Sequence, residues 1–116
     1  MTKNNPALVV LSKRGEETAR QIKCAFPAME IHALNARATG DIGFEKAAPH
    51  LIHLFKQGRP IIGLCAAGIL IRSLAPVLGD KWQEPAVIAL SEDGSNIVPL
   101  LGGHHGANDL AKALAG

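Results

Sequence analysis

The feature of this sequence that most constrains its fold is an alternation between short apolar runs and longer segments with helical spacing. Residues 7–12, "ALVVLS", form a nearly continuous apolar run, as expected for a strand buried on both faces of a parallel sheet. The next segment, "KRGEETARQIKCAF", carries Ala19, Ile22 and Phe26 at helical spacing and ends at Pro27. Repetition of strand and helix in this way predicts βαβ units.

The same alternation continues to the carboxyl end of the chain. Residues 35–43 collect glycine and polar residues and predict a loop, Gly58 predicts a helix end, and Asp93-Gly94 predicts a hairpin turn. We therefore expect a three-layer α/β/α sandwich with a mainly parallel, mixed sheet of about five strands. The other expected strands are residues 29–34, 60–65, 85–90 and 96–101, and the other expected helices are residues 44–58, 66–78 and a last one from about Ala107.

Composition excludes several classes of function. The 116 residues suffice for one domain, residues 1–116, and the final "KALAG" near the end of a helical pattern suggests a piece of a longer protein. Aromatic residues are only 3% and the net charge is +2, so we expect no nucleic-acid partner. No apolar run approaches the roughly 20 residues of a membrane span, and "MTKNNP" does not resemble a secretory signal, so we expect no membrane and a cytoplasmic location.

The sequence predicts no resident metal and no cofactor. Cys24 and Cys65 do not have metal-type spacing, and the adjacent His104 and His105 point in different directions in most backbones. His50 and His53 are expected to be neighbours with a plain surface role on one helix.

The first of two unusual strand-to-helix junctions is "GLCAAG", residues 63–68. It keeps the outer glycines of a dinucleotide-binding fingerprint but has Cys65 in place of the central one, and Glu92 lies near where a ribose-binding acid would fall. Nucleotide binding is one interpretation, and close packing of helix on strand at Gly68 is the plainer one. Cys65 is either a nucleophile activated at a helix start or a small buried apolar residue.

Arg72 follows within the same predicted helix, in an apolar stretch. An arginine in such surroundings needs a partner or a route to water. It is either solvated or paired in an ordinary way, or it is a ligand for a substrate carboxylate, which matches the guanidinium fork.

The second junction, "LLGGHHGANDL", places three glycines and two histidines between a strand and a helix. Gly102, Gly103 and Gly106 permit a close approach of a ligand to the backbone, and the helix start suits a carboxylate or phosphate. Asn108 or Asp109 is alternatively the cap of that helix. Because both junctions follow predicted strands, we expect Arg72 and this turn to lie close together on one side of the sheet.

Residues 63–111 resemble the N-terminal domain of the CbiG family, the cobalt-precorrin-5A hydrolases of cobalamin biosynthesis. Pro85, Ala86 and Val87 match the family's "DPAV", with Glu84 in place of its aspartate, and the first half of the chain fits only in element order. Gly102 replaces a serine, and the turn is one residue shorter than in the family pattern. The helix motif is matched by Ala67, Gly68, Ile69, Arg72, Leu74, Ala75 and Pro76, and the turn by Gly103, His104, Gly106, Ala107, Asn108, Leu110 and Ala111.

The resemblance implies a role in corrin-ring assembly. Hydrolases of this family open a δ-lactone on the A-ring side of the macrocycle, after which acetaldehyde is lost, so the implied partners are a corrinoid or precorrin substrate and other domains of the same polypeptide. Any cobalt would arrive inside the substrate. His104 is the implied general base, because an ordinary imidazole titrates near neutral pH. The implied substrate-binding residues are Cys65, Gly68, Arg72, Gly102, Gly103, Gly106 and Asn108.

Two other functions stay open at this point. The shorter turn is associated with CbiG-like domains fused to a precorrin-3B C(17)-methyltransferase, in which this domain would bind and dock the corrinoid without catalysis. A nucleotide-binding domain using "GLCAAG" is the second alternative. The sequence also leaves open whether the chain self-associates and whether it is catalytic by itself.

Overall fold

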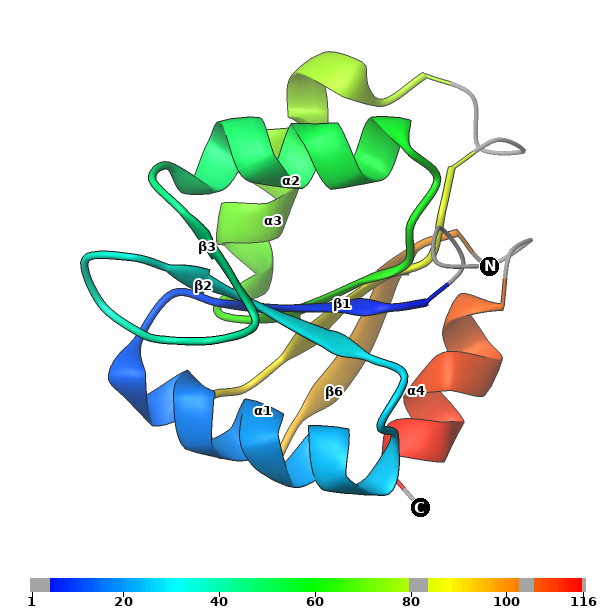
Figure 1. Ribbon diagram of the computed structural model, residues 1–116. Helices are drawn as coiled ribbons and strands as arrows, with labels where there is room; N and C mark the ends of the chain where they lie inside the picture. Colours follow the sequence, from blue (N-terminus) through cyan, green and yellow to red (C-terminus); the bar gives the residue numbers. More distant parts are fainter. Residues whose placement is uncertain (1–4, 80–83, 103–105, 116) are drawn as a thin grey trace.

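The domain is a six-stranded sheet covered by helices on both faces (Figure 1). The computed structural model describes residues 5–79, 84–102 and 106–115. The strand order is β3-β2-β1-β4-β5-β6, with every neighbouring pair parallel except β5 and β6. The strands are β1 (Ala7–Val10), β2 (Glu30–Leu34), β3 (Ile42–Phe44), β4 (Ile61–Leu64), β5 (Val87–Leu90) and β6 (Ile97–Leu101).

Within the described residues, two helices lie on each face of the sheet. Those on one face are α2 (Ala47–Lys56) and α3 (Ala67–Leu74), the latter continuing into a 3-10 turn (Ala75–Val77). Those on the other face are α1 (Lys13–Ala25) and α4 (Ala107–Ala115). The predicted three-layer sandwich with a mixed, mainly parallel sheet is confirmed.

The strand that the sequence does not predict is β3. It takes the last two residues of the expected loop of residues 35–43 and Phe44 of the expected helix of residues 44–58, and that helix begins instead at Ala47. Only Ile42 and Phe44 are apolar in β3, so its own sequence carries too little pattern to be recognised. The strand forms because it pairs with β2, and because the Asp41 carboxylate accepts the Ile31 N–H at 2.9 Å. The same carboxylate pairs with the Lys23 ammonium at 2.5 Å, which ties the edge of the sheet to α1.

The core has two layers because successive residues of the central strand face opposite sides of the sheet. Ala7 and Val9 pack under α2 and α3, whereas Leu8 and Val10 pack under α1, and all four are fully buried. The unbroken apolar run of the first strand is therefore explained by burial on both faces. At roughly 1.5–3 kcal/mol for each large buried side chain, these strands supply much of the driving force for folding.

The predicted turns are confirmed where the backbone requires glycine. Gly58, with φ of 75°, follows the end of α2, and Gly94, with φ of 80°, lies at the tip of the hairpin between β5 and β6. No helix in the described part of the chain has the length and apolar character needed to cross a membrane.

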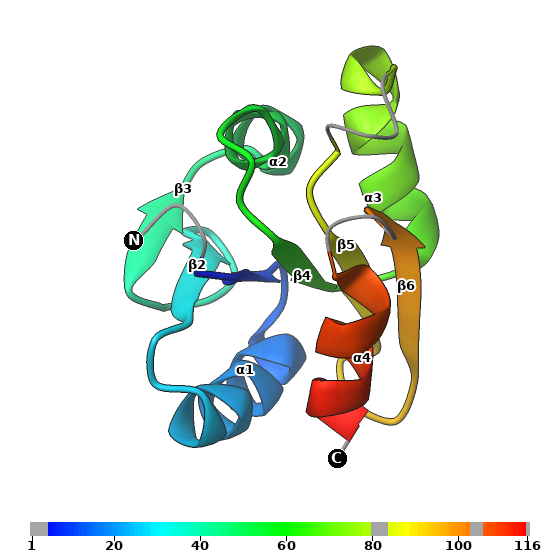
Figure 2. The ribbon, with the colours of Figure 1, turned by 90° about the vertical axis from the view of Figure 1, so that its right-hand side faces the viewer.

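The order of the strands creates a switch point between β1 and β4. These two strands are parallel neighbours, yet the chain leaves β1 for α1 on one face and leaves β4 for α3 on the other. Figure 2 shows the two helices on opposite sides of the sheet. In open α/β sheets this arrangement leaves a crevice at the carboxyl ends of the two strands, where ligands commonly bind.

Candidate functional site

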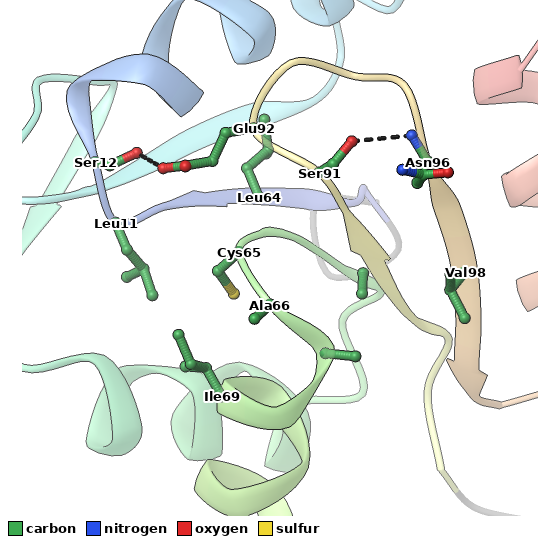
Figure 3. Close-up of a pocket in the computed structure, with 12 residues that line it drawn as sticks. Leu11, Ser12, Leu64, Cys65, Ala66, Ile69, Ser91, Glu92, Asn96 and Val98 are labelled. Carbon is green, nitrogen blue, oxygen red and sulfur yellow. Dashed lines mark hydrogen bonds between the residues drawn. The ribbon is translucent and has the colours of Figure 1, made fainter.

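A crevice of about 600 Å³ lies at this switch point (Figure 3). Its walls come from the end of β1, from the β4–α3 junction and from the hairpin between β5 and β6, and most of the lining is apolar. No side chain caps α3, whose first N–H groups lie at the same place. The lining residues are Leu11, Ser12, Leu64, Cys65, Ala66, Ala67, Ile69, Ala89, Ser91, Glu92, Asn96 and Val98.

The polar end of the crevice is formed by Ser12 and Glu92. The Ser12 hydroxyl donates a hydrogen bond to a Glu92 carboxylate oxygen, and it accepts the Gly15 N–H at 3.2 Å as the N-cap of α1 (Figure 3). The Thr18 hydroxyl donates to the backbone carbonyl of Glu92. The carboxylate is thus held in place from the first turns of α1.

Charge in the crevice comes from Glu92 alone. None of the twelve lining residues, all within the described part of the chain, is Lys, Arg or His. A phosphate bound here would face a carboxylate with no lining cation to offset the repulsion. The arrangement is better suited to an uncharged group that accepts or donates hydrogen bonds and has an apolar surface.

Cys65 is half-buried in the wall of the crevice. Burial raises the pKa of its thiol from 9.0 to about 11, and the negative charge of Glu92 acts in the same direction. The thiol is therefore protonated at neutral pH, which is the opposite of what an activated nucleophile needs. Of the two interpretations from the sequence, the geometry favours the small apolar wall residue.

This environment predicts slow alkylation of Cys65. A rise of two pKa units lowers the reactive thiolate fraction at pH 8 by about a hundredfold relative to an unperturbed thiol. Iodoacetamide labelling of Cys24→Ser and Cys65→Ser variants, followed by mass spectrometry, compares Cys65 with the exposed Cys24. Equal labelling rates in the two variants would show that Cys65 is not shielded in the crevice.

The glycines of "GLCAAG" have packing roles. A Cβ at Gly63 would lie 2.7 Å from a methyl group of Leu70, so this glycine allows α3 to pack closely on β4. A Cβ at Gly68 would lie 3.2 Å from a guanidinium nitrogen of Arg72. Neither Gly68 nor Arg72 lines the crevice, and Arg72 is exposed on α3. The Gly63 contact favours helix–strand packing over a dinucleotide fingerprint. At Gly68 the neighbour is Arg72 of the same helix, so the close packing on the strand occurs at Gly63 and not at Gly68, where it was expected.

The second junction begins beside the amino end of β5, whereas the crevice lies at the carboxyl ends of β1 and β4. Because β6 is antiparallel to β5, its carboxyl end pairs Leu101 with Val87, at the start of β5. Gly102 follows with φ of 78° and packs against the backbone of Pro85 and Ala86. The expectation that Cys65 and Gly102 belong to one site is therefore wrong. The hairpin predicted at Asp93-Gly94 already implied that β6 runs antiparallel to β5, which places the end of β6 away from the end of β4.

The expectation that Arg72 lies beside this turn is also wrong. Arg72 belongs to α3, whose Leu70 and Leu74 pack on one face of the sheet. The helix after the turn, α4, packs Leu110 and Leu114 on the other face (Figure 2). The sheet itself separates the two groups.

Only the ends of the turn are described. Gly103, His104 and His105 lie outside the described residues. Gly106 is exposed with φ of 86°, and its carbonyl accepts the Leu110 N–H at 2.9 Å, so it occupies the N-cap position of α4. Asn108 and Asp109 lie inside the first turn, and the interpretation of either as the cap is wrong.

The sequence interpretation missed a contact between a buried histidine, His32, and a partly buried one, His50. His50 was expected on the surface, but its Nε2 lies 2.7 Å from Nδ1 of His32, which is only 2% exposed. Nε2 of His32 lies 3.3 Å from the Glu30 carboxylate, which also pairs with Arg59 at 2.8 Å. Burial lowers the pKa of both imidazoles, that of His50 to about 4. Among the described residues, no group of three metal-ligating side chains forms.

The chain is similar to a family of domains and to two curated proteins. Residues 49–116 match the family described as "Cobalamin synthesis G N-terminal". The chain is 30% identical over 94% of its length to a cobalt-precorrin-5A hydrolase of Priestia megaterium, and 33% identical over 95% to one of Salmonella typhimurium. It spans about a third of each relative, 31% and 32% respectively.

A solved structure shares the fold. The chain superposes on a cobalamin biosynthesis protein G homolog from Sulfolobus solfataricus with a TM-score of 0.69 at 22% identity. The match covers 98% of this chain and 35% of the other. Since the family match includes more than half of the residues, the chain belongs to the family of N-terminal domains of cobalamin synthesis protein G.

Proposed function

We propose that this chain acts in cobalamin biosynthesis as the N-terminal part of a cobalt-precorrin-5A hydrolase, which opens the A-ring δ-lactone of the corrin precursor with loss of acetaldehyde. The observation that supports this most is identity of 30% and 33% to two such hydrolases over nearly the whole chain. Because those relatives are about three times as long, the activity is proposed for the intact protein and not for these residues alone.

The switch-point crevice supports the choice of an uncharged reacting group. A lactone is a neutral ester, and its ring carbons suit the walls formed by Ala66, Ile69 and Val98. Ile69 and Val98 are 40% and 47% exposed, so the rim of the crevice is apolar and accessible. Only one edge of a macrocycle would enter a crevice of about 600 Å³, and the remainder would be held by other domains.

The activity is tested with the intact protein and cobalt-precorrin-5A. We expect one acetaldehyde released for each substrate consumed, measured by trapping the aldehyde with a hydrazine reagent. The same protein lacking residues 1–116 is the control, and it is expected to release none.

A second candidate, the docking domain of a bifunctional methyltransferase, is favoured by the shortened turn at residues 102–108. It makes a different prediction for the same experiment. Tight binding of the corrinoid by the intact protein, without any release of acetaldehyde, would contradict the hydrolase proposal and support docking.

The family resemblance implies that His104 is the general base of this reaction. Its removal by His104→Ala would then lower kcat by at least about a hundredfold, the usual contribution of a positioned base. The crevice contains a different candidate for that role, and the two make separable predictions.

A further inference from the structure

We propose that Glu92 is the group that activates water in this domain, and that the switch-point crevice takes the lactone-bearing edge of the substrate. This inference rests on the proposed hydrolase function and assigns its catalytic base.

The contacts of Glu92 suit a base better than a structural carboxylate. Three other carboxylates of the described chain are each paired with a cation within 2.8 Å, in the pairs Glu16–Arg20, Asp41–Lys23 and Glu30–Arg59. Glu92 has no cation partner among the described residues and receives one side-chain hydrogen bond there, from Ser12. The carboxylate oxygen that Ser12 does not contact is therefore available to accept a hydrogen bond from a water in the crevice.

Glu92 is also held firmly enough to act at a defined position. Ser12 fixes one carboxylate oxygen while serving as the N-cap of α1, and Thr18 fixes the backbone carbonyl. The hairpin that carries Glu92 is closed by the Ser91 N–H, which donates to the Asn96 carbonyl at 3.0 Å. Positioning from two elements limits the freedom of the carboxylate, as general-base catalysis requires.

The surroundings of Glu92 in the crevice favour hydrolysis of a neutral ester. Cys65 is a protonated thiol and lies in a wall that is otherwise mostly aliphatic, so Glu92 is the one carboxylate among the lining residues and has no lining imidazole or amine beside it. Aliphatic walls around one carboxylate also strengthen its interaction with a bound water by lowering the local dielectric.

The proposed step balances without any further reagent. A water held by the free oxygen of Glu92 gives its proton to the carboxylate as its oxygen forms a bond to the lactone carbonyl carbon. The tetrahedral intermediate collapses, the ring C–O bond breaks, and the departing alkoxide takes the proton back from Glu92. One water is consumed, one carboxylic acid and one alcohol are formed, and the Glu92 carboxylate is regenerated.

The test compares Glu92→Gln with Glu17→Gln in the intact protein. Glutamine at position 92 still accepts the Ser12 hydrogen bond, so the fold should be kept, but its amide cannot take a proton from water. Glu17 is an exposed residue of α1 and serves as the matched control for loss of one carboxylate. Lactone opening is followed as kcat and KM between pH 4 and 9, with the melting temperature as a check on folding.

We expect Glu92→Gln to lower kcat at least about a hundredfold, with KM within about threefold of the wild type. Glu17→Gln should match the wild type. An active wild type whose kcat survives Glu92→Gln would overturn the assignment and leave the hydrolase proposal intact, and loss of kcat in His104→Ala alone would then identify His104 as the base. A wild type without lactonase activity would overturn both proposals.

Discussion

Replacing Gly102 by alanine is expected to destabilise the domain by about 3–4 kcal/mol, although only one methyl group is added. Gly102 has φ of 78°, a left-handed conformation that costs a residue with a Cβ about 1–2 kcal/mol. The new Cβ would also lie 2.4 Å from the carbonyl oxygen of Pro85 and 2.6 Å from Cα of Ala86. Both contacts are with backbone atoms at the entry to β5, which move only if the sheet moves.

Gly106→Ala is the matched control. Gly106 also has a left-handed backbone, with φ of 86°, but a Cβ there would meet nothing within 4 Å. It should cost only about 1 kcal/mol, so urea unfolding of the two variants separates the packing contribution at Gly102 from the cost of the backbone conformation. Equal destabilisation of the two variants would show that the approach to Pro85 is not tight in solution.

This result bears on how the second junction is interpreted. The sequence suggests that its glycines let a ligand approach the backbone, and for Gly102 the neighbour that approaches is the chain itself at Pro85–Ala86. A glycine that replaces the family's serine in a shorter turn is consistent with the left-handed backbone found there. If Gly102→Ala lost corrinoid binding, the loss would therefore come from destabilisation of the fold as well as from any lost contact with the ligand.

Much of the fold could be predicted because its strands are apolar on both faces. Runs such as residues 7–12 and 60–65 need no partner to be recognised, since burial under two helix layers removes polar residues from them. The strand Ile42–Phe44 lacks that signal, because it lies at the edge and depends on pairing with β2 and on the Asp41 contacts. Its stability comes from residues elsewhere in the chain.

The candidate site could be predicted only in part, for a related reason. The junction at Cys65 was identified from its small residues, and it does line the crevice. Its polar partners were not, because Ser12 and Glu92 are 80 positions apart and meet only through the strand order β1-β4-β5. In the sequence, Glu92 suggested a ribose-binding acid, and in the structure it lines the crevice and accepts a hydrogen bond from Ser12. A single sequence gives the residues of such a site but does not show which of them lie side by side in the fold.

The contact between His32 and His50 predicts a specific loss of stability in mild acid. At neutral pH one imidazole nitrogen donates to the other across the 2.7 Å between His32 and His50, and the His50 ring stacks on Phe44 at 4.4 Å. Protonation of both rings would remove the acceptor and place two cations side by side. The packing between β2, β3 and α2 therefore requires that the two imidazoles stay neutral.

The direction of the pH dependence follows from the pKa of His50. Burial, followed by the charges of His32, His53 and Arg59, lowers it from 6.5 to about 4 in the folded protein. Between these values the unfolded chain binds the proton and the folded chain does not, so stability is full above about pH 6.5 and falls as the pH drops through about 4. With allowance for the partial exposure of His50, this contribution is about 2 kcal/mol.

The control variant must allow for the other charged groups near the two histidines. Burial lowers the pKa of His32 and Arg59 acts in the same direction, whereas Glu30 and Asp41 raise it, and the net result is a lowered pKa. We expect the unfolding free energy of the wild type to fall by about 2 kcal/mol more than that of His50→Gln between pH 7 and 4.5, because glutamine can keep a hydrogen bond to His32 but does not titrate. Lys56→Gln, an exposed change on the same helix, should follow the wild type. Parallel curves for wild type and His50→Gln would contradict a neutral, buried His50, since the pH dependence would then come from carboxylates such as Glu30 and Asp41.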